Sequence, residues 1–306
     1  MIYKIVFFVF CGLSLLTIDS KACSICGCAS GANYNGILPQ YRKNIIALRH
    51  RYRGFDQSIK QINGGYLNST YTYSSYELWG RIYLKDRLQF FFSLPYSVNT
   101  LTDMDGKSTL SGLNDMSFQL NYNVINTTFD TSRVHTVQHN LLIGAGVKLP
   151  TGKYQQRNAN DLMYSPNFQA GSGAFSYLGS IIYTLRYRKV GLNADVNYIY
   201  NTENELKYAF GNQLTSSLTG FAWLQNGSFS FLPNTGVFYE YLNRDIDNGY
   251  YNSLSGGYAL NYHAGLDVYF KNMFLGLTLQ TPMIQEIGSD QIKYQAKYMV
   301  NLGFLF

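Results

Sequence analysis

The sequence has little charge, little proline and, beyond Ile18, no long apolar run. Charged residues make up 14% of the 306 residues, and there are 6 prolines. An average soluble domain carries about a quarter charged residues. Since a spanning helix needs roughly 20 apolar residues, any membrane crossing has to be made by strands. The net charge of +6 is small and dispersed, which argues against nucleic acid as a partner.

Twelve segments instead alternate apolar and polar residues with a period of two. In 114–125, Phe118 and Leu120 face one side, while Gln119 and Asn121 face the other. This pattern predicts an all-β, antiparallel transmembrane barrel of about twelve strands, with lipid outside and a polar lumen inside. A secreted β-sandwich is less favoured, because it would not need an outward face so free of charge. The expected strands are 44–53, 73–84, 87–97, 114–125, 137–149, 174–187, 190–200, 212–224, 228–242, 257–270, 273–283 and 298–306.

Two of these segments are less regular. In 212–224, Leu218 and Phe221 lie on opposite faces, so the orientation of this strand is ambiguous. In 228–242, Pro233 cannot donate to a ladder, which predicts a bulge or kink there. The alternative is a turn over 232–236 that splits the strand.

The connections between these segments alternate in length. Tight turns are expected at 85–86, 189, 225–227 and 271–272, whereas 54–72, 98–113, 150–173, 201–211, 243–256 and 284–294 are long and polar. Short periplasmic turns and long extracellular loops are typical of outer-membrane barrels. We therefore expect both termini in the periplasm, with localisation in the cell outer membrane.

The two ends of the chain carry export signals. Residues 5–18 are apolar and are followed by a small-x-small site ending at Ala22, which is the pattern of a secretory signal peptide over 1–22. Residues 23–42 lack a strand period and predict a periplasmic arm or a plug, and the barrel occupies 43–306. The final aromatic residue, Phe306, resembles the signal by which bacterial outer-membrane barrels are recognised for assembly. Expected partners are outer-membrane lipid, the barrel-assembly machinery and a small-molecule solute.

Charged and polar side chains on the inward face are the candidate lumen-lining residues. Acids and bases are nearly balanced among them, so two interpretations stand. They can set a field across an aqueous channel, or they can pair with one another and fill a narrow lumen. Pairing is favoured, because an unpaired buried charge is costly. The candidates are Arg49, Arg51, Glu77, Arg81, Arg87, Asp115, Lys148, Arg186, Asp195, Glu240, His263 and Asp267.

Cys23, Cys26 and Cys28 are the one compact group of soft ligands. Thiolates at this spacing can converge on copper or zinc. A disulfide between two of them is the alternative in an oxidising periplasm. Lipidation of Cys23 is disfavoured by Lys21 at the preceding cleavage site. The alternative hypothesis for the function is therefore a structural or metal-linked barrel in which this N-terminal arm is the functional element.

Catalysis is not expected. A hydrolase would need a Ser beside a His and an acid, and none of the 4 His stands in such a local pattern. No organic cofactor is expected either.

Three segments resemble a known family. They are SLPYSV at 93–98, SGLNDMSFQLNY at 111–122 and GAGVKLPTGKY at 144–154. Together they resemble the outer-membrane barrels of the meta-pathway phenol-degradation family, which is similar to the long-chain fatty-acid channels. The resemblance covers about a tenth of the chain. It implies a porin-like transporter that takes up small, often hydrophobic compounds by passive diffusion, and it assigns no binding residue.

Overall fold

A computed structural model describes residues 43–60, 65–104, 106–127, 136–158, 161–288 and 291–306. The predicted signal peptide (1–22) and cysteine arm (23–42) lie outside the described residues. No helix in the described ranges has the length and hydropathy of a membrane span.

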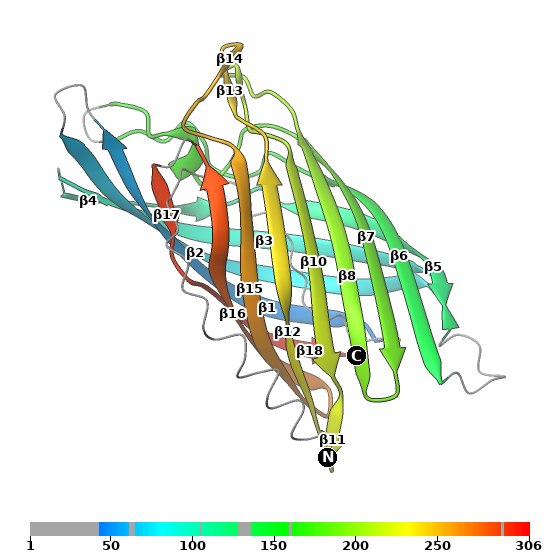
Figure 1. The fold of residues 1–306 in the computed structure, drawn as a ribbon. Coiled ribbons are helices and arrows are strands. Elements are labelled where there is room, and N and C mark those ends of the chain that lie inside the picture. Colours follow the sequence, from blue (N-terminus) through cyan, green and yellow to red (C-terminus); the bar gives the residue numbers. More distant parts are fainter. Residues whose placement is uncertain (1–42, 61–64, 105, 128–135, 159–160, 289–290) are drawn as a thin grey trace.

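The described chain forms a closed antiparallel barrel of twelve strands, as predicted from the period-two pattern. Each wall strand pairs with its neighbours in chain order (Figure 1). The wall strands are β1 (Ile45–Lys60), β2 (Tyr66–Lys85), β3 (Leu88–Asp103), β5 (Ser117–Asn126), β6 (Val137–Lys148), β7 (Ser176–Tyr187), β8 (Val190–Asn201), β10 (Gln213–Ala222), β12 (Phe229–Leu242), β15 (Gly257–Phe270), β16 (Met273–Ile287) and β18 (Lys297–Leu305). Short elements decorate the wall: β4 (Gly106–Leu113), β9 (Tyr208–Ala209), β11 (Leu224–Asn226), β13 (Ile246–Asp247), β14 (Tyr250–Tyr251), β17 (Ile292–Tyr294) and the 3-10 helix η3 (Pro166–Phe168).

The first and last strands close the barrel. β18 pairs with β1 from Ile45↔Leu305 to Tyr52↔Tyr298. Beyond the strands, the Asn44 amide donates to the Phe306 carbonyl at 2.8 Å. The C-terminus therefore lies at the end of the barrel that carries the tight turns, here called the turn end, and the opposite end is called the loop end (Figure 1).

The predicted alternation between the two faces is confirmed. Leu48 and Leu120 point outward and are 62% and 49% exposed, while the inward Asn121 is fully buried. Tyr52 and Tyr298 stack on the outer face toward the loop end, where aromatic side chains suit a membrane interface. The ambiguous strand is resolved in β10, where Leu218 faces outward and Phe221 faces the interior.

Three predicted loops are wrong in part. Within 284–294, β16 continues to Ile287 and β17 begins at Ile292. Residues 54–60 and 66–72 continue β1 and β2 as a hairpin, paired from Gly54↔Thr72 to Lys60↔Tyr66. Residues 98–103 likewise continue β3, which pairs with β4. Beyond the lipid the outward face of these strands becomes polar, with residues such as Asp56 and Thr70, while the inward face still carries Phe55 and Tyr71, so the apolar-outward pattern disappears. Thr, Ser and Tyr still favour extended pairing there.

The bulge or turn predicted at Pro233 is also wrong. β12 runs unbroken through this residue, and Pro233 pairs in register with Leu266 of β15. On the other side the ladder lapses between Phe221↔Asn234 and Leu224↔Phe231, with no change of register. The missing N–H of Pro233 accounts for a local loss of pairing on one side. The register on both sides of Pro233 is kept, so neither a bulge nor a turn is present.

Candidate functional site in the barrel interior

The middle of the interior is polar, and its most connected group is a triad of charges. Both Arg49 and Arg51 approach the same carboxylate oxygen of Glu77, at 3.4 and 2.5 Å. The other oxygen of Glu77 accepts from the Ser93 hydroxyl. Arg49 also donates from Nε to the Asn301 side chain at 2.7 Å and lies 4.4 Å from the centre of the Trp79 ring. These partners allow charges to remain in an interior position where an isolated ion would be very costly.

Other predicted residues contact partners on wall strands that lie near them or across the interior. Lys297 contacts Glu240 at 2.8 Å. His263 is fully buried, and its Nε2 lies 3.1 Å from the Thr219 hydroxyl. Asp195 accepts from Ser217 and from Asn197. Asp267 lies within electrostatic range of Arg49. The polar middle is therefore a network rather than a row of free charges.

Five predicted residues have other surroundings. Arg81 donates to the Lys43 carbonyl near the turn end at 3.1 Å, and Arg186 lies over the Trp223 ring at 5.5 Å. Arg87 is exposed in the turn between β2 and β3. Asp115 contacts Lys148 at 3.9 Å.

Asp115 also fastens the long connection that follows β6. Its carboxylate accepts from the backbone amides of Gly152 and Ser172, each at 3.0 Å, and from the Ser172 hydroxyl at 2.5 Å. The two residues lie near the two ends of this connection. Asp115 thus holds both of its ends against the start of β5.

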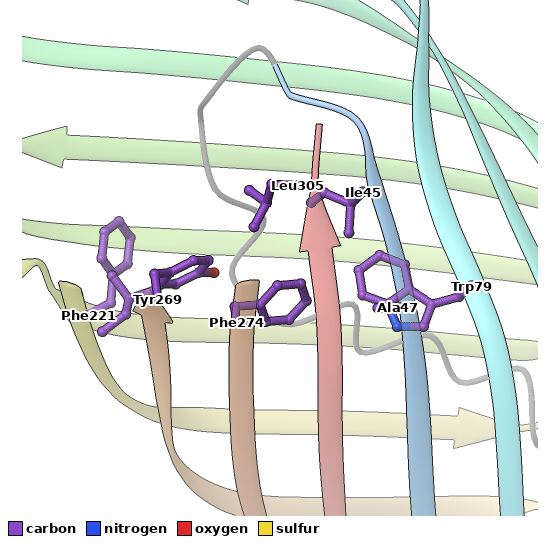
Figure 2. Packing of buried hydrophobic residues seen from close by; sticks show 8 residues of the cluster. Ile45, Ala47, Trp79, Phe221, Tyr269, Phe274 and Leu305 are labelled. Carbon is purple, nitrogen blue, oxygen red and sulfur yellow. The ribbon is translucent and has the colours of Figure 1, made fainter. Parts of the chain in front are cut away.

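The turn end of the interior is filled by apolar side chains, which we call the turn-end cluster. They come from adjacent wall strands running from β10 round to β2, and Phe274 lies between Tyr269 and Leu305 (Figure 2). Trp223 packs against the group and stacks on Tyr269 at 5.7 Å. The members are Ile45, Ala47, Trp79, Phe221, Leu232, Tyr269, Phe274 and Leu305.

A second apolar group, the loop-end cluster, occupies the opposite end. Its centre is Phe168 in η3, which is 1% exposed although it belongs to a connection and not to the wall. Tyr71, in the part of β2 beyond the lipid-facing residues, packs against Phe55 and Phe168 with ring centres 5.3 and 6.1 Å apart. Burial, together with the charge of Asp103, raises the pKa of the Tyr71 phenol, so it stays neutral. The members are Phe55, Tyr73, Leu110, Phe168, Leu242, Ala259 and Tyr294.

Polar contacts hold Pro166–Phe168, here called the plug segment, in the interior. The wall supplies Asn99, which donates to the Phe168 carbonyl at 2.8 Å, and Tyr73, which donates to the Asn167 carbonyl at 3.1 Å. The Asn167 side chain in turn donates to Asp245 at 3.0 Å.

Asp245 is the hub of the loop end. Besides Asn167, its carboxylate accepts from the Tyr208 hydroxyl at 2.6 Å and from the Gly211 amide at 2.8 Å. Its own amide donates to the Ser255 hydroxyl at 2.8 Å. Three separate connections therefore meet at one buried carboxylate, 2% exposed.

Two of the cavities among the described residues are relevant here. One of about 30 Å³ in the polar middle is lined by Arg49, Glu77, Ser93 and Gln119 among others, which is enough room for a water molecule. A wider one of about 700 Å³ lies at the loop end beside Asp56, Thr70 and Lys293.

Sequence reasoning missed the plug segment, Asp245 and the two apolar clusters. The apolar interior positions were hidden because a polar lumen was assumed for every inward residue. The one available signal for the plug was Pro166 with two aromatic neighbours, Tyr164 and Phe168, inside an otherwise polar connection.

The predicted metal ligands Cys23, Cys26 and Cys28 lie outside the described residues. Within the described ranges no group of three or more His, Cys, Asp or Glu side chains could hold a metal ion.

No family model matches the chain, and no curated protein matches it by sequence. Among solved structures, it is similar to an outer-membrane channel from Pseudomonas putida F1, with a TM-score of 0.63 at 12% identity over 96% of this chain and 100% of the other. The fold is that of an outer-membrane barrel. Also similar are the β domain of the Bordetella autotransporter BrkA, with a TM-score of 0.48 at 9% identity over 86% and 99% of the two chains, and a deletion mutant of the TodX monoaromatic hydrocarbon channel, with a TM-score of 0.39 at 10% identity over 87% and 90%.

The likeness to the Pseudomonas putida channel confirms the predicted resemblance to outer-membrane channels at the level of the fold. Since the sequence identity is low, this likeness concerns the barrel and not the residues inside it.

Proposed function

We propose that this protein is an outer-membrane channel that admits small, hydrophobic molecules by passive diffusion. In this proposal the turn end and both termini face the periplasm, and the loop end faces the outside, as short turns and long loops imply. Its partners are outer-membrane lipid, the assembly machinery and the solute. The proposal includes no catalytic step.

The observation that carries the proposal is the plug segment. A barrel with a purely structural interior can be filled from its own wall. Here a connection supplies the central aromatic side chain, Phe168, and polar contacts from Tyr73, Asn99 and Asp245 hold it in place. The segment is held by the packing of one aromatic ring and by three hydrogen bonds, none of which belongs to the wall ladder. It can therefore leave without breaking that ladder.

The chemistry of the path supports a hydrophobic solute. Aromatic surface from Phe55, Tyr71 and Phe168 stands at the loop end, and aromatic surface from Trp79, Tyr269 and Phe274 stands at the turn end. An apolar molecule with one polar group can rest against either cluster and pass a hydrogen-bonding middle. Ligand sites commonly combine such apolar lining with a few polar groups.

The test is Phe168→Ala in purified protein and in cells. Truncating a buried Phe removes about 3–5 kcal/mol of packing, so the plug segment should be displaced more often. We expect proteoliposomes to swell faster in small sugars, and cells to take up a hydrophobic dye faster through an intact outer membrane. Phe118→Ala is the matched control, because Phe118 faces lipid against Phe90 and its loss should leave permeation unchanged.

Two outcomes would contradict the proposal. One is a folded Phe168→Ala protein that passes neither sugar nor dye above the empty-liposome rate. The other is an equal increase in the Phe118→Ala control, which would mean that leakage follows from a weaker barrel and not from the plug segment.

A further inference from the structure

The turn end carries a strongly one-sided charge. Among the described residues of this rim, six are cationic and one is acidic: Lys43, Lys85, Arg87, Arg188, Lys189 and Lys271 against Asp86. All of these cations except Lys43 are exposed. They are spread over three hairpin turns and the start of β1.

The loop end shows no such bias. Its described acids include Asp56, Asp103, Asp161, Glu203, Glu205, Asp247 and Glu286, and its described bases include Lys107, Lys153, Arg157, Lys207, Arg244 and Lys293. Several of these pair with each other, such as Lys207 with Glu203 at 3.1 Å and Arg157 with Asp161 at 3.3 Å. The excess of positive charge is therefore a property of one rim.

The cations stand directly beside the lipid-facing surface. The Lys271 ammonium lies 5.3 Å from the centre of the Phe270 ring, and the Arg188 guanidinium lies 5.3 Å from the centre of the Tyr187 ring. Both rings face outward and are 39% and 47% exposed. Aromatic side chains at this position mark the boundary between hydrocarbon and headgroups, so the cations reach the headgroup layer.

The backbone supplies an independent observation. Arg188 and Lys271 have φ angles of 51° and 52°, in the left-handed region that favours Gly, Asn and Asp in hairpin turns. A cation therefore occupies the least suitable position of two separate turns. Strain of this kind is retained where the side chain has a use.

We propose that this cationic rim binds the phosphate groups of anionic phospholipids. Lys and Arg both bind phosphate, Lys as a point charge and Arg through a planar fork. The neighbouring rings would pack on the acyl chains of the same lipids. In the orientation proposed above, these lipids lie in the leaflet that faces the periplasm. That placement rests on the proposed function, whereas the preference for anionic lipids does not.

The test compares phosphatidylglycerol with phosphatidylcholine. Detergent-solubilised protein is mixed with equal amounts of both lipids, and native mass spectrometry gives the ratio of the two bound lipids. We expect wild-type protein to favour phosphatidylglycerol, and the preference to fall about five-fold for each cation removed near the headgroups. Raising the salt from roughly 50 mM to 500 mM should weaken it in wild-type protein as well.

The informative variant is Arg188→Asn combined with Lys271→Asn. Asn tolerates a positive φ better than Arg or Lys, so thermal stability should be kept or raised while the lipid preference falls about 25-fold. Lys207→Asn is the matched control, because Lys207 also has a positive φ, of 60°, but lies at the loop end. Its preference should equal that of wild-type protein.

Several results would overturn the proposal. These are a wild-type ratio near one, a ratio insensitive to salt, or a double variant that keeps the wild-type preference. Soluble glycerol phosphate is added in a separate arm, and displacement of the lipid by it at equal concentration would show a general anion site instead. None of these measurements involves permeation, so they can fail while the channel proposal stands, and the reverse also holds.

Discussion

Asp245→Asn should open the channel by weakening the attachment of the plug segment. The carboxylate accepts from Asn167, Tyr208 and Gly211 at 2.6–3.0 Å. An amide has one acceptor oxygen, and its NH2 group would face the Asn167 donor. At least that bond is lost, and the others no longer involve a charge.

The size of the effect follows from these bonds. Hydrogen bonds to a charged group contribute about 1.5–3 kcal/mol each. Only the bond from Asn167 joins Asp245 to the plug segment, so its loss should cost about 1.5–3 kcal/mol in the attached state. At 1.4 kcal/mol per factor of ten, the released fraction should rise about 10- to 140-fold.

The assay is liposome swelling combined with limited trypsin digestion after Lys153 and Arg157, which lie in the same connection as the plug segment. Swelling and cleavage should both accelerate. Asp247→Asn is the matched control, since Asp247 is exposed and contacts Asn248. Refutation would be a folded Asp245→Asn protein that is cleaved faster yet permeates at the wild-type rate, because the plug segment would then not limit passage.

Two further predictions concern the wall and its orientation. Phe118→Arg, on the lipid face of β5, should impair assembly because Arg near the bilayer midplane of a barrel costs about 2–4 kcal/mol. Gln119→Arg should assemble, since Gln119 lines the same small cavity as the Glu77 carboxylate. Heat-modifiable migration on gels measures the assembly of both variants, and equal damage would mean that the faces are misassigned. An epitope tag beside Leu162, which is 64% exposed at the loop end, should be labelled on intact cells. A tag at Lys85–Asp86 should be labelled only after the outer membrane is opened. The reverse pattern would mean that the proposed orientation is inverted.

The wall was predictable from the sequence because lipid acts on every second residue. Leu120 is 49% exposed to the surroundings of the barrel and its neighbour Asn121 is fully buried. The sequence shows this contrast as an alternation of apolar and polar residues. Strand number and strand faces follow from it, as does closure by the final strand. Where lipid ends, the contrast ends too, which is why the sequence pattern predicts loops at the hairpin extensions of β1–β2 and β3–β4.

The interior was less predictable, because what fills it comes from distant parts of the chain. Phe221 was ambiguous since an apolar inward residue conflicts with a polar lumen, and only the turn-end cluster explains it. Asp245 and Asn167 meet across 78 residues of sequence. No local pattern announces such a pair. Charges such as Arg49 and Glu77 were identified as inward, but their shared carboxylate contact depends on the register between β1 and β2.

The pairing of β1 with β18 also bears on the order of folding. Ile45 and Leu305 are partners in this ladder, so the seam joins the two strands that are farthest apart along the barrel sequence. Hairpins such as β7–β8 can form from neighbouring residues within microseconds, but the seam needs the last strand to be present. The barrel must therefore exist first as an open, curved sheet with two unpaired edges, which are prone to pairing with other chains. Those edges stay unpaired until the final ladder forms, and a chain truncated before β18 would be left open there.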